Sequence, residues 1–124
     1  MKKSFILLAL LFFTTSCSGS GISSPTPTLT NQESIGKAAF TTYCAACHSV
    51  DPGAVIVGPS LYDVASKAGE RVEGQNAKTY LSLSMMKPGD YLVEGYDDTM
   101  PKDFGTRLTG EEFDSLVAYL LTLR

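Results

Sequence analysis

The sequence predicts an all-α domain of about four helices. No run of residues alternates between apolar and polar side chains over the length of a strand, whereas several segments repeat their apolar residues at helical spacing. The segment nearest the C-terminus also begins with a capping box, and glycines and prolines separate the earlier helical segments. The chain has 124 residues, enough for one domain, which we expect to cover residues 31–124.

Residues 1–16 have the composition of an export signal. Two lysines near the N-terminus precede an apolar run over residues 5–13, which is too short to span a bilayer comfortably and is therefore expected to be cleaved. The formal net charge is −3 and charged residues make up 19% of the chain, so no basic surface indicates nucleic-acid binding.

Cys17 follows this apolar run directly. Two small residues precede it, as in the lipobox of bacterial lipoproteins, whose cysteine is lipidated and becomes the mature N-terminus; Thr14 departs from that pattern, since an aliphatic residue is usual there. The alternative is a plain signal peptide, with Cys17 removed or left as a stray thiol. Residues 18–30 are rich in Ser, Gly, Thr and Pro, so residues 17–30 are predicted to be a lipidated cysteine with a flexible linker. The protein is then exported and anchored by lipid, in the periplasm or at the outer face of the cell membrane.

The first helix of the domain is predicted over residues 32–47, with Asn31 as its N-cap. A small residue on one face should let another helix approach, beside an aromatic residue with a large apolar surface. The residues of this face are Gly36, Phe40, Tyr43, Cys44 and Cys47.

Residues 44–48 read Cys-Ala-Ala-Cys-His, the attachment signature of c-type haem. Residues three apart share one face of a helix, so the sulfurs of Cys44 and Cys47 can reach the two vinyl groups of one porphyrin, and His48 can bind the iron. A thioredoxin-like redox pair would need a βαβ context, and a zinc site would need two further Cys or His ligands. The sequence offers neither, so we expect one haem c held covalently through Cys44 and Cys47.

A second, short helix is predicted to start after Gly58-Pro59, with proline at its first position and Gly69 as its stop. Its inward-facing residues are expected to be Leu61, Val64 and Ala65. A third helix is predicted over residues 77–86, capped by Asn76 and ended by Pro88.

The last helix begins at a capping box formed by Thr109 and Glu112. We expect it to cross the first helix where Gly36 leaves room. Its apolar stripe consists of Phe113, Leu116, Val117, Leu120 and Leu121, with Tyr119 adjoining.

From residue 31 to residue 124 the chain resembles a class I cytochrome c. The resemblance rests on the order and spacing of Gly36 and Phe40 before the haem motif, Gly-Pro-Ser-Leu at 58–61, Met100-Pro101, and Leu-Val-Ala-Tyr-Leu at 116–120. It implies an all-α fold of about four helices around one covalent haem, and an electron carrier rather than an enzyme. It also implies that the Pro59 carbonyl accepts a hydrogen bond from His48, and that Met100 is the second axial ligand of the iron.

The residues themselves narrow the choice of second ligand only in part. His48 is the only histidine, so one subunit cannot supply two histidine ligands. The remaining candidates are Met85, Met86, Met100 and, less plausibly, a lysine. Met85 and Met86 lie in the predicted third helix, where methionine is more often a core gap-filler, whereas Met100 lies in a loop that can bend to aim its thioether.

Four further polar residues are candidates to bind the haem propionates, since phenol and guanidinium groups are suitable donors to carboxylates. They are Tyr80, Tyr91, Tyr96 and Arg71. An equally good interpretation makes the tyrosines ordinary residues at the edge of the core and Arg71 a solvated cation.

Three acidic residues, Glu94, Asp97 and Asp98, precede Met100. The surface beside the ligand loop is therefore expected to be acidic, unlike the lysine-ringed docking face of mitochondrial cytochromes c. A partner docking there would need a basic patch, although a solvated acidic segment is the simpler interpretation.

Two strong axial ligands would leave no open iron site, so one-electron transfer is the expected function. The leading hypothesis is a membrane-tethered monohaem carrier in a respiratory or photosynthetic chain, with a quinol-oxidising complex, a terminal oxidase or a reaction centre as partner. A second hypothesis makes the domain a fixed haem c subunit of a quinol-oxidising or terminal oxidase complex. A third, a haem sensor or peroxidase-like enzyme, requires that Met100 is not a stable ligand.

Overall fold

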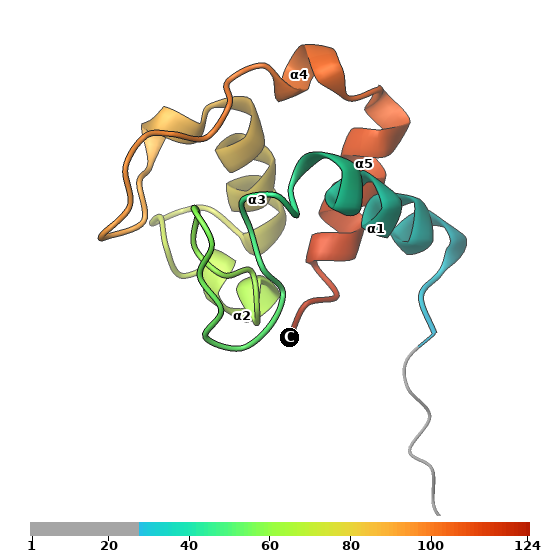
Figure 1. The fold of residues 1–124 in the computed structure, drawn as a ribbon, viewed down its shortest axis with the longest axis horizontal. Helices are drawn as coiled ribbons and strands as arrows, with labels where there is room; N and C mark the ends of the chain where they lie inside the picture. The colour runs from blue at the N-terminus through green and yellow to red at the C-terminus, as the bar shows by residue number, and fades with distance from the viewer. Residues whose placement is uncertain (1–27) are drawn as a thin grey trace, which may run out of the picture.

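The computed structural model of the protein describes residues 28–124. These residues form five α-helices and one 3₁₀ turn, and none of them forms a strand (Figure 1). The prediction of an all-α fold is confirmed. The elements are α1 (Asn31–Tyr43), α2 (Val64–Ala68), α3 (Ala77–Met86), η1 (Pro88–Asp90), α4 (Phe104–Arg107) and α5 (Gly110–Leu120).

The predicted export signal at residues 1–16, the lipidation candidate Cys17 and the linker up to residue 27 lie outside the described residues. Among residues 28–124, no helix has the length and apolar character needed to cross a membrane.

The N-terminal and C-terminal helices, α1 and α5, cross on the right of Figure 1. They approach closely at Gly36, which is buried; a Cβ atom there would overlap the backbone oxygen of Ser115 and lie 2.8 Å from Cβ of Tyr119. Next to this crossing, the rings of Phe40 and Tyr119 pack with their centroids 5.7 Å apart. The predicted crossing at Gly36 is confirmed.

The helix boundaries follow the caps. α5 begins at the predicted capping box of Thr109 and Glu112, and α3 begins after Asn76, whose side chain accepts a hydrogen bond from the backbone N–H of Thr79. The prediction of Asn31 as the N-cap of α1 is wrong. Thr30 caps this helix, because Thr30 and Glu33 form a second capping box that satisfies two backbone N–H groups reciprocally.

The first and second helices are shorter than predicted. α1 ends at Tyr43, so Cys44 and Cys47 lie in the turn that follows it and not in the helix. α2 begins at Val64 and not at Pro59, because residues 58–61 are held in a loop by other contacts, among them a 2.7 Å hydrogen bond from the Leu61 N–H to the Ser49 carbonyl. The predicted stop at Gly69 is confirmed.

The core brings the apolar faces of all five helices together, with Leu116 and Ala68 fully buried. Val64 of α2 is buried as predicted, whereas Leu61 and Ala65 are only half-buried. The buried members of the C-terminal stripe are Leu116, Val117, Tyr119 and Leu120; Phe113 and Leu121 pack at its edge.

Candidate functional site

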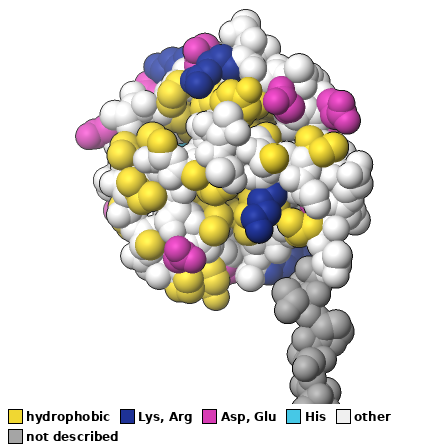
Figure 2. Space-filling model, turned by 45° about the vertical axis from the view of Figure 1, so that its right-hand side comes forward, with side chains coloured by type: hydrophobic (Ala, Val, Ile, Leu, Met, Phe, Trp, Pro, Cys, Tyr) yellow, Lys and Arg dark blue, Asp and Glu magenta, His cyan; other side chains and the backbone are white. Residues whose placement is uncertain are grey.

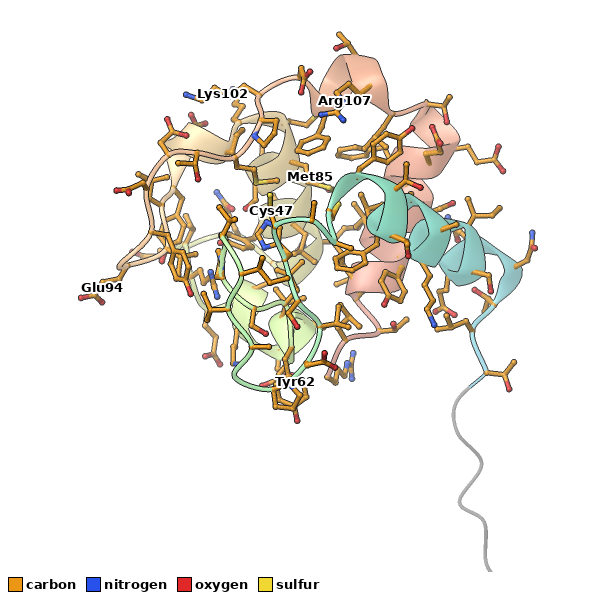
Figure 3. All side chains as sticks on the ribbon, viewed as in Figure 1. Cys47, Tyr62, Met85, Glu94, Lys102 and Arg107 are labelled. Carbon is orange, nitrogen blue, oxygen red and sulfur yellow. The ribbon has the colours of Figure 1, made fainter. Side chains whose placement is uncertain are left out.

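An apolar cleft opens between the loop after α1, helix α3, and the loop that leads into α4. It contains about 1180 Å³ of space free of protein atoms, part of it open to solvent. That space suits a whole small molecule rather than a water. Figure 3 shows Cys47 and Met85 near the centre of the molecule, whereas Tyr62, Glu94 and Lys102 lie at its periphery.

Both cysteines of the motif and His48 line this cleft. The turn that carries them continues from α1: the Cys44 N–H donates to the Phe40 carbonyl at 2.8 Å, and the N–H groups of Cys47 and His48 donate to the Cys44 carbonyl at 3.0 and 2.9 Å. Helix α1 thus ends in one tight turn, from which Cys44, Cys47 and His48 all face the cleft.

The two cysteines are free and half-buried thiols. Burial, and then the neighbouring Cys47, raise the pKa of the Cys44 thiol to about 11. A thioredoxin-like nucleophile requires a lowered thiol pKa, so this environment disfavours a redox-pair role. Within residues 28–124 no group of three or more His, Cys, Asp or Glu side chains could hold a metal ion, so the zinc alternative finds no ligand set there.

The His48 ring is oriented by the loop at Gly58 and Pro59. Nδ1 of His48 lies 2.8 Å from the Pro59 carbonyl oxygen, and a carbonyl can only accept, so Nδ1 carries the proton and donates. Nε2 is then left with its lone pair free for a metal. A Cβ atom at Gly58 would lie only 2.5 Å from Cε1 of His48, so this position has no room for a larger residue.

The methionines differ in their relation to the cleft. Met100 is half-buried and lines it, and Met85, buried in α3, lines it as well. Met86 is 47% exposed and points to Gly105 of α4 instead, where a Cβ atom would lie 2.9 Å from its Cε. Among the described residues, the methionines at the cleft that could be the second iron ligand are therefore Met100 and Met85.

An ion pair joins the residues two positions before and two positions after Met100. Nζ of Lys102 lies 2.7 Å from a carboxylate oxygen of Asp98, two residues on either side of the methionine. The same carboxylate approaches Gly89 of η1, where a Cβ atom would lie 3.1 Å from it. Both side chains of the pair are more than a third exposed, so the pair contributes little to the free energy of folding.

The polar candidates also gather at the cleft. Arg71 donates to the hydroxyl of Tyr80 at 3.2 Å, and its guanidinium carbon lies 5.5 Å from the centroid of that ring. Tyr80 is buried and meets the ring of Tyr91 edge-on, with centroids 5.7 Å apart. Tyr96 lines the cleft from the loop before Met100. The structure thus places the cofactor-site candidates Cys44, Cys47, His48, Pro59, Tyr80, Tyr96 and Met100 on one cleft, with Arg71, Tyr91 and Met85, whereas Met86 lies outside it.

The sequence profile of the cytochrome c family matches residues 33–124. The chain belongs to the cytochrome c family. No curated protein matches the chain significantly. Members of this family bind haem c covalently through two cysteines, and Cys44 and Cys47 of this cytochrome c have the spacing of that attachment.

The residues of the cleft fit this group. Two thiols on one turn, an imidazole with a free Nε2, and mostly apolar walls suit a porphyrin attached at its vinyl groups. As a haem protein of this family, the cytochrome c serves electron transfer.

Two features of the site were not predicted. The close contact of Gly58 with the His48 ring could have been suspected from the glycine beside Pro59, which we used only to place the second helix and for the resemblance. Helix α4 was not predicted, and its Gly105 packs on Met86.

Proposed function

We propose that this cytochrome c is a membrane-tethered, monohaem one-electron carrier of a respiratory or photosynthetic chain, with His48 and Met100 as axial ligands of its iron. The observation that carries the proposal is the 2.8 Å bond from Nδ1 of His48 to Pro59, together with a methionine thioether on the same cleft. His48 and Met100 would hold the iron from both sides of the haem, which would leave no open site for substrate and require little rearrangement when one electron is exchanged.

Met100 is the better of the two cleft methionines for this role. Met85 is only 5% exposed and belongs to the packed face of α3, so its side chain is part of the hydrophobic core. Moving this side chain toward the iron would leave a void in the core. Met100 belongs to a loop without regular structure, where the thioether can adjust to a metal. A thioether opposite imidazole favours the reduced iron, so the reduction potential should be higher than with two nitrogen ligands.

Arg71, Tyr80 and Tyr96 are proposed to hold the haem propionates. Arg71 is half-buried and uses one of its five N–H donors on Tyr80, so others remain for a carboxylate. Tyr80 is buried, and its hydroxyl is kept in place by Arg71.

Redox partners are proposed to dock beside the cleft. Apolar side chains reach the surface over the face seen in Figure 2, among scattered charges. At the cleft, Val57 is 55% exposed, and its neighbours Val55 and Ile56 are 60% and 54% exposed. Consecutive exposed aliphatic residues of this kind offer an apolar contact area, which would lose its water on binding to a quinol-oxidising complex, a terminal oxidase or a reaction centre.

The tether is proposed to be a lipid on Cys17, at the outer face of the cell membrane or in the periplasm. Replacing Cys17 with serine is expected to move the haem protein from the membrane fraction to the soluble fraction, because the acyl chains supply the membrane affinity. Electron flow through the membrane chain should fall with it, as the carrier is diluted away from its partners. Haem-stained gels of both fractions and the rate of cytochrome reoxidation measure the two effects.

A Ser18→Ala variant, which keeps Cys17, is the matched control and should stay membrane-bound. If the Cys17→Ser protein remains in the membrane and resists high salt, the lipid tether is wrong. If it remains there and copurifies with other subunits in mild detergent, the domain is a fixed subunit of a complex instead of a mobile carrier.

A further inference from the structure

The guanidinium of Arg107 lies close to two aromatic rings from different parts of the chain. Its central carbon is 5.6 Å from the ring centroid of Tyr43 and 5.5 Å from that of Phe104. Tyr43 is the last residue of α1, directly before the haem-attachment turn, and Phe104 is the first residue of α4. Arg107, itself the last residue of α4, thus joins this helix to the end of α1.

Both rings belong to the cleft. Tyr43 and Phe104 are among its lining residues, and Phe104 is only 4% exposed. Phe104 also follows Met100 by four positions, so the placement of α4 fixes the C-terminal end of the loop that carries the methionine. On another side, Gly105 packs against Met86 of α3.

We propose that Arg107 is a positioning residue, whose cation–π contacts with Tyr43 and Phe104 hold the Met100 loop closed over the cleft and so protect the Met100 ligand from displacement. The proposal rests on the proposed function, because it takes Met100 as the axial ligand.

The planar guanidinium is suited to this role. It can face two rings at once, whereas a lysine ammonium is a compact, strongly hydrated point charge. The ion pair of Arg107 with Asp103, at 3.6 Å, joins two side chains that are 43% and 59% exposed and contributes little. Of the contacts of Arg107, the one with Tyr43 is therefore the one that joins α4 to α1, whereas the ion pair with Asp103 links residues of the same segment.

The test is a titration of the oxidised holoprotein with imidazole, which competes with Met100 for the iron. Binding is followed by loss of the weak near-infrared sulfur-to-iron band. In Arg107→Leu the affinity for imidazole is expected to rise roughly three- to fivefold, since the cation–π contact with Tyr43, which joins α4 to α1, no longer opposes opening of the loop. Arg107→Lys should show a smaller rise, because the charge is kept but cannot stack on both rings.

Two controls separate positioning from general destabilisation. Asp103→Asn removes the ion pair and keeps the stack, so its imidazole affinity should match that of the parent. Val117→Ala weakens the core in α5, at a buried residue outside the cleft lining, and should lower the denaturation midpoint without raising imidazole affinity.

Unchanged imidazole affinity in Arg107→Leu would overturn the proposal, as would a rise of the same size in Val117→Ala. An Arg107→Lys protein identical to the parent would assign the effect to charge and contradict the stack. A parent protein without the near-infrared band would contradict ligation by Met100, and the proposal for Arg107 would be rejected with it. In a parent protein with the band, the imidazole titrations test the role of Arg107 alone.

Discussion

Replacing Gly36 with alanine is expected to lower the free energy of unfolding by about 3 kcal/mol or more. The added Cβ atom would overlap the backbone oxygen of Ser115 and crowd Cβ of Tyr119, and neither can rotate away. The helices α1 and α5 would have to separate at their crossing, and the neighbouring contact of Phe40 with Tyr119 would loosen. Denaturant unfolding of the holoprotein, followed by far-ultraviolet circular dichroism, measures the loss.

Gly110→Ala is the matched control for this variant. Gly110 is also a helical glycine, at the start of α5, but no atom outside its chain neighbours and its own helix backbone lies within 4 Å of the position where its Cβ would be. Alanine there should be neutral or stabilise by up to about 1 kcal/mol, because it restricts the unfolded chain. A Gly36→Ala protein as stable as Gly110→Ala would contradict the close helix crossing.

Replacing Gly58 with alanine is expected to displace the imidazole of His48 and to cost about 2 kcal/mol of stability. The new Cβ would lie 2.5 Å from Cε1 and 2.9 Å from Nδ1 of the ring, so ring or loop must shift and the bond to the Pro59 carbonyl is strained. Since that bond keeps the proton on Nδ1, the histidine should lose its fixed orientation toward the iron. Solvent exchange of the Nδ1 proton, observed by NMR, should become faster than in the parent.

Gly110→Ala again provides the comparison, because it adds the same methyl group far from the ring. A Gly58→Ala protein whose Nδ1 proton stays as protected as in the parent would show that the loop at Pro59 does not orient His48. A loss of stability alone, with protection kept, would assign the effect to the loop and not to the ligand.

The sequence predicted the elements that local chemistry determines. The third helix was predicted with both of its bounds because Asn76 caps it and Pro88 ends it, and the last helix was located by its capping box. The first helix was predicted too long, because helical spacing continues through the attachment motif while the backbone changes to a turn after Tyr43.

Elements that depend on tertiary contacts were not predictable in this way. Helix α2 starts late because Pro59 and its neighbours are engaged by His48 and Ser49, residues that belong to another segment. Helix α4 has four residues, too few to show a period, and packs through Gly105 and Arg107 on distant side chains. The attachment residues were evident from their spacing, whereas the contacts of Gly58 and Arg107 needed the folded chain.

The most direct test of the account is the near-infrared absorption of the purified oxidised protein, compared with Met100→Ala and with Met85→Leu as the volume-conserving control. We predict a weak sulfur-to-iron band in the parent and in Met85→Leu, and its loss in Met100→Ala. A band that survives in Met100→Ala and is lost in Met85→Leu would assign the ligand to α3. A parent without the band that binds CO when reduced would contradict the electron carrier and favour a haem sensor or a peroxidase-like enzyme.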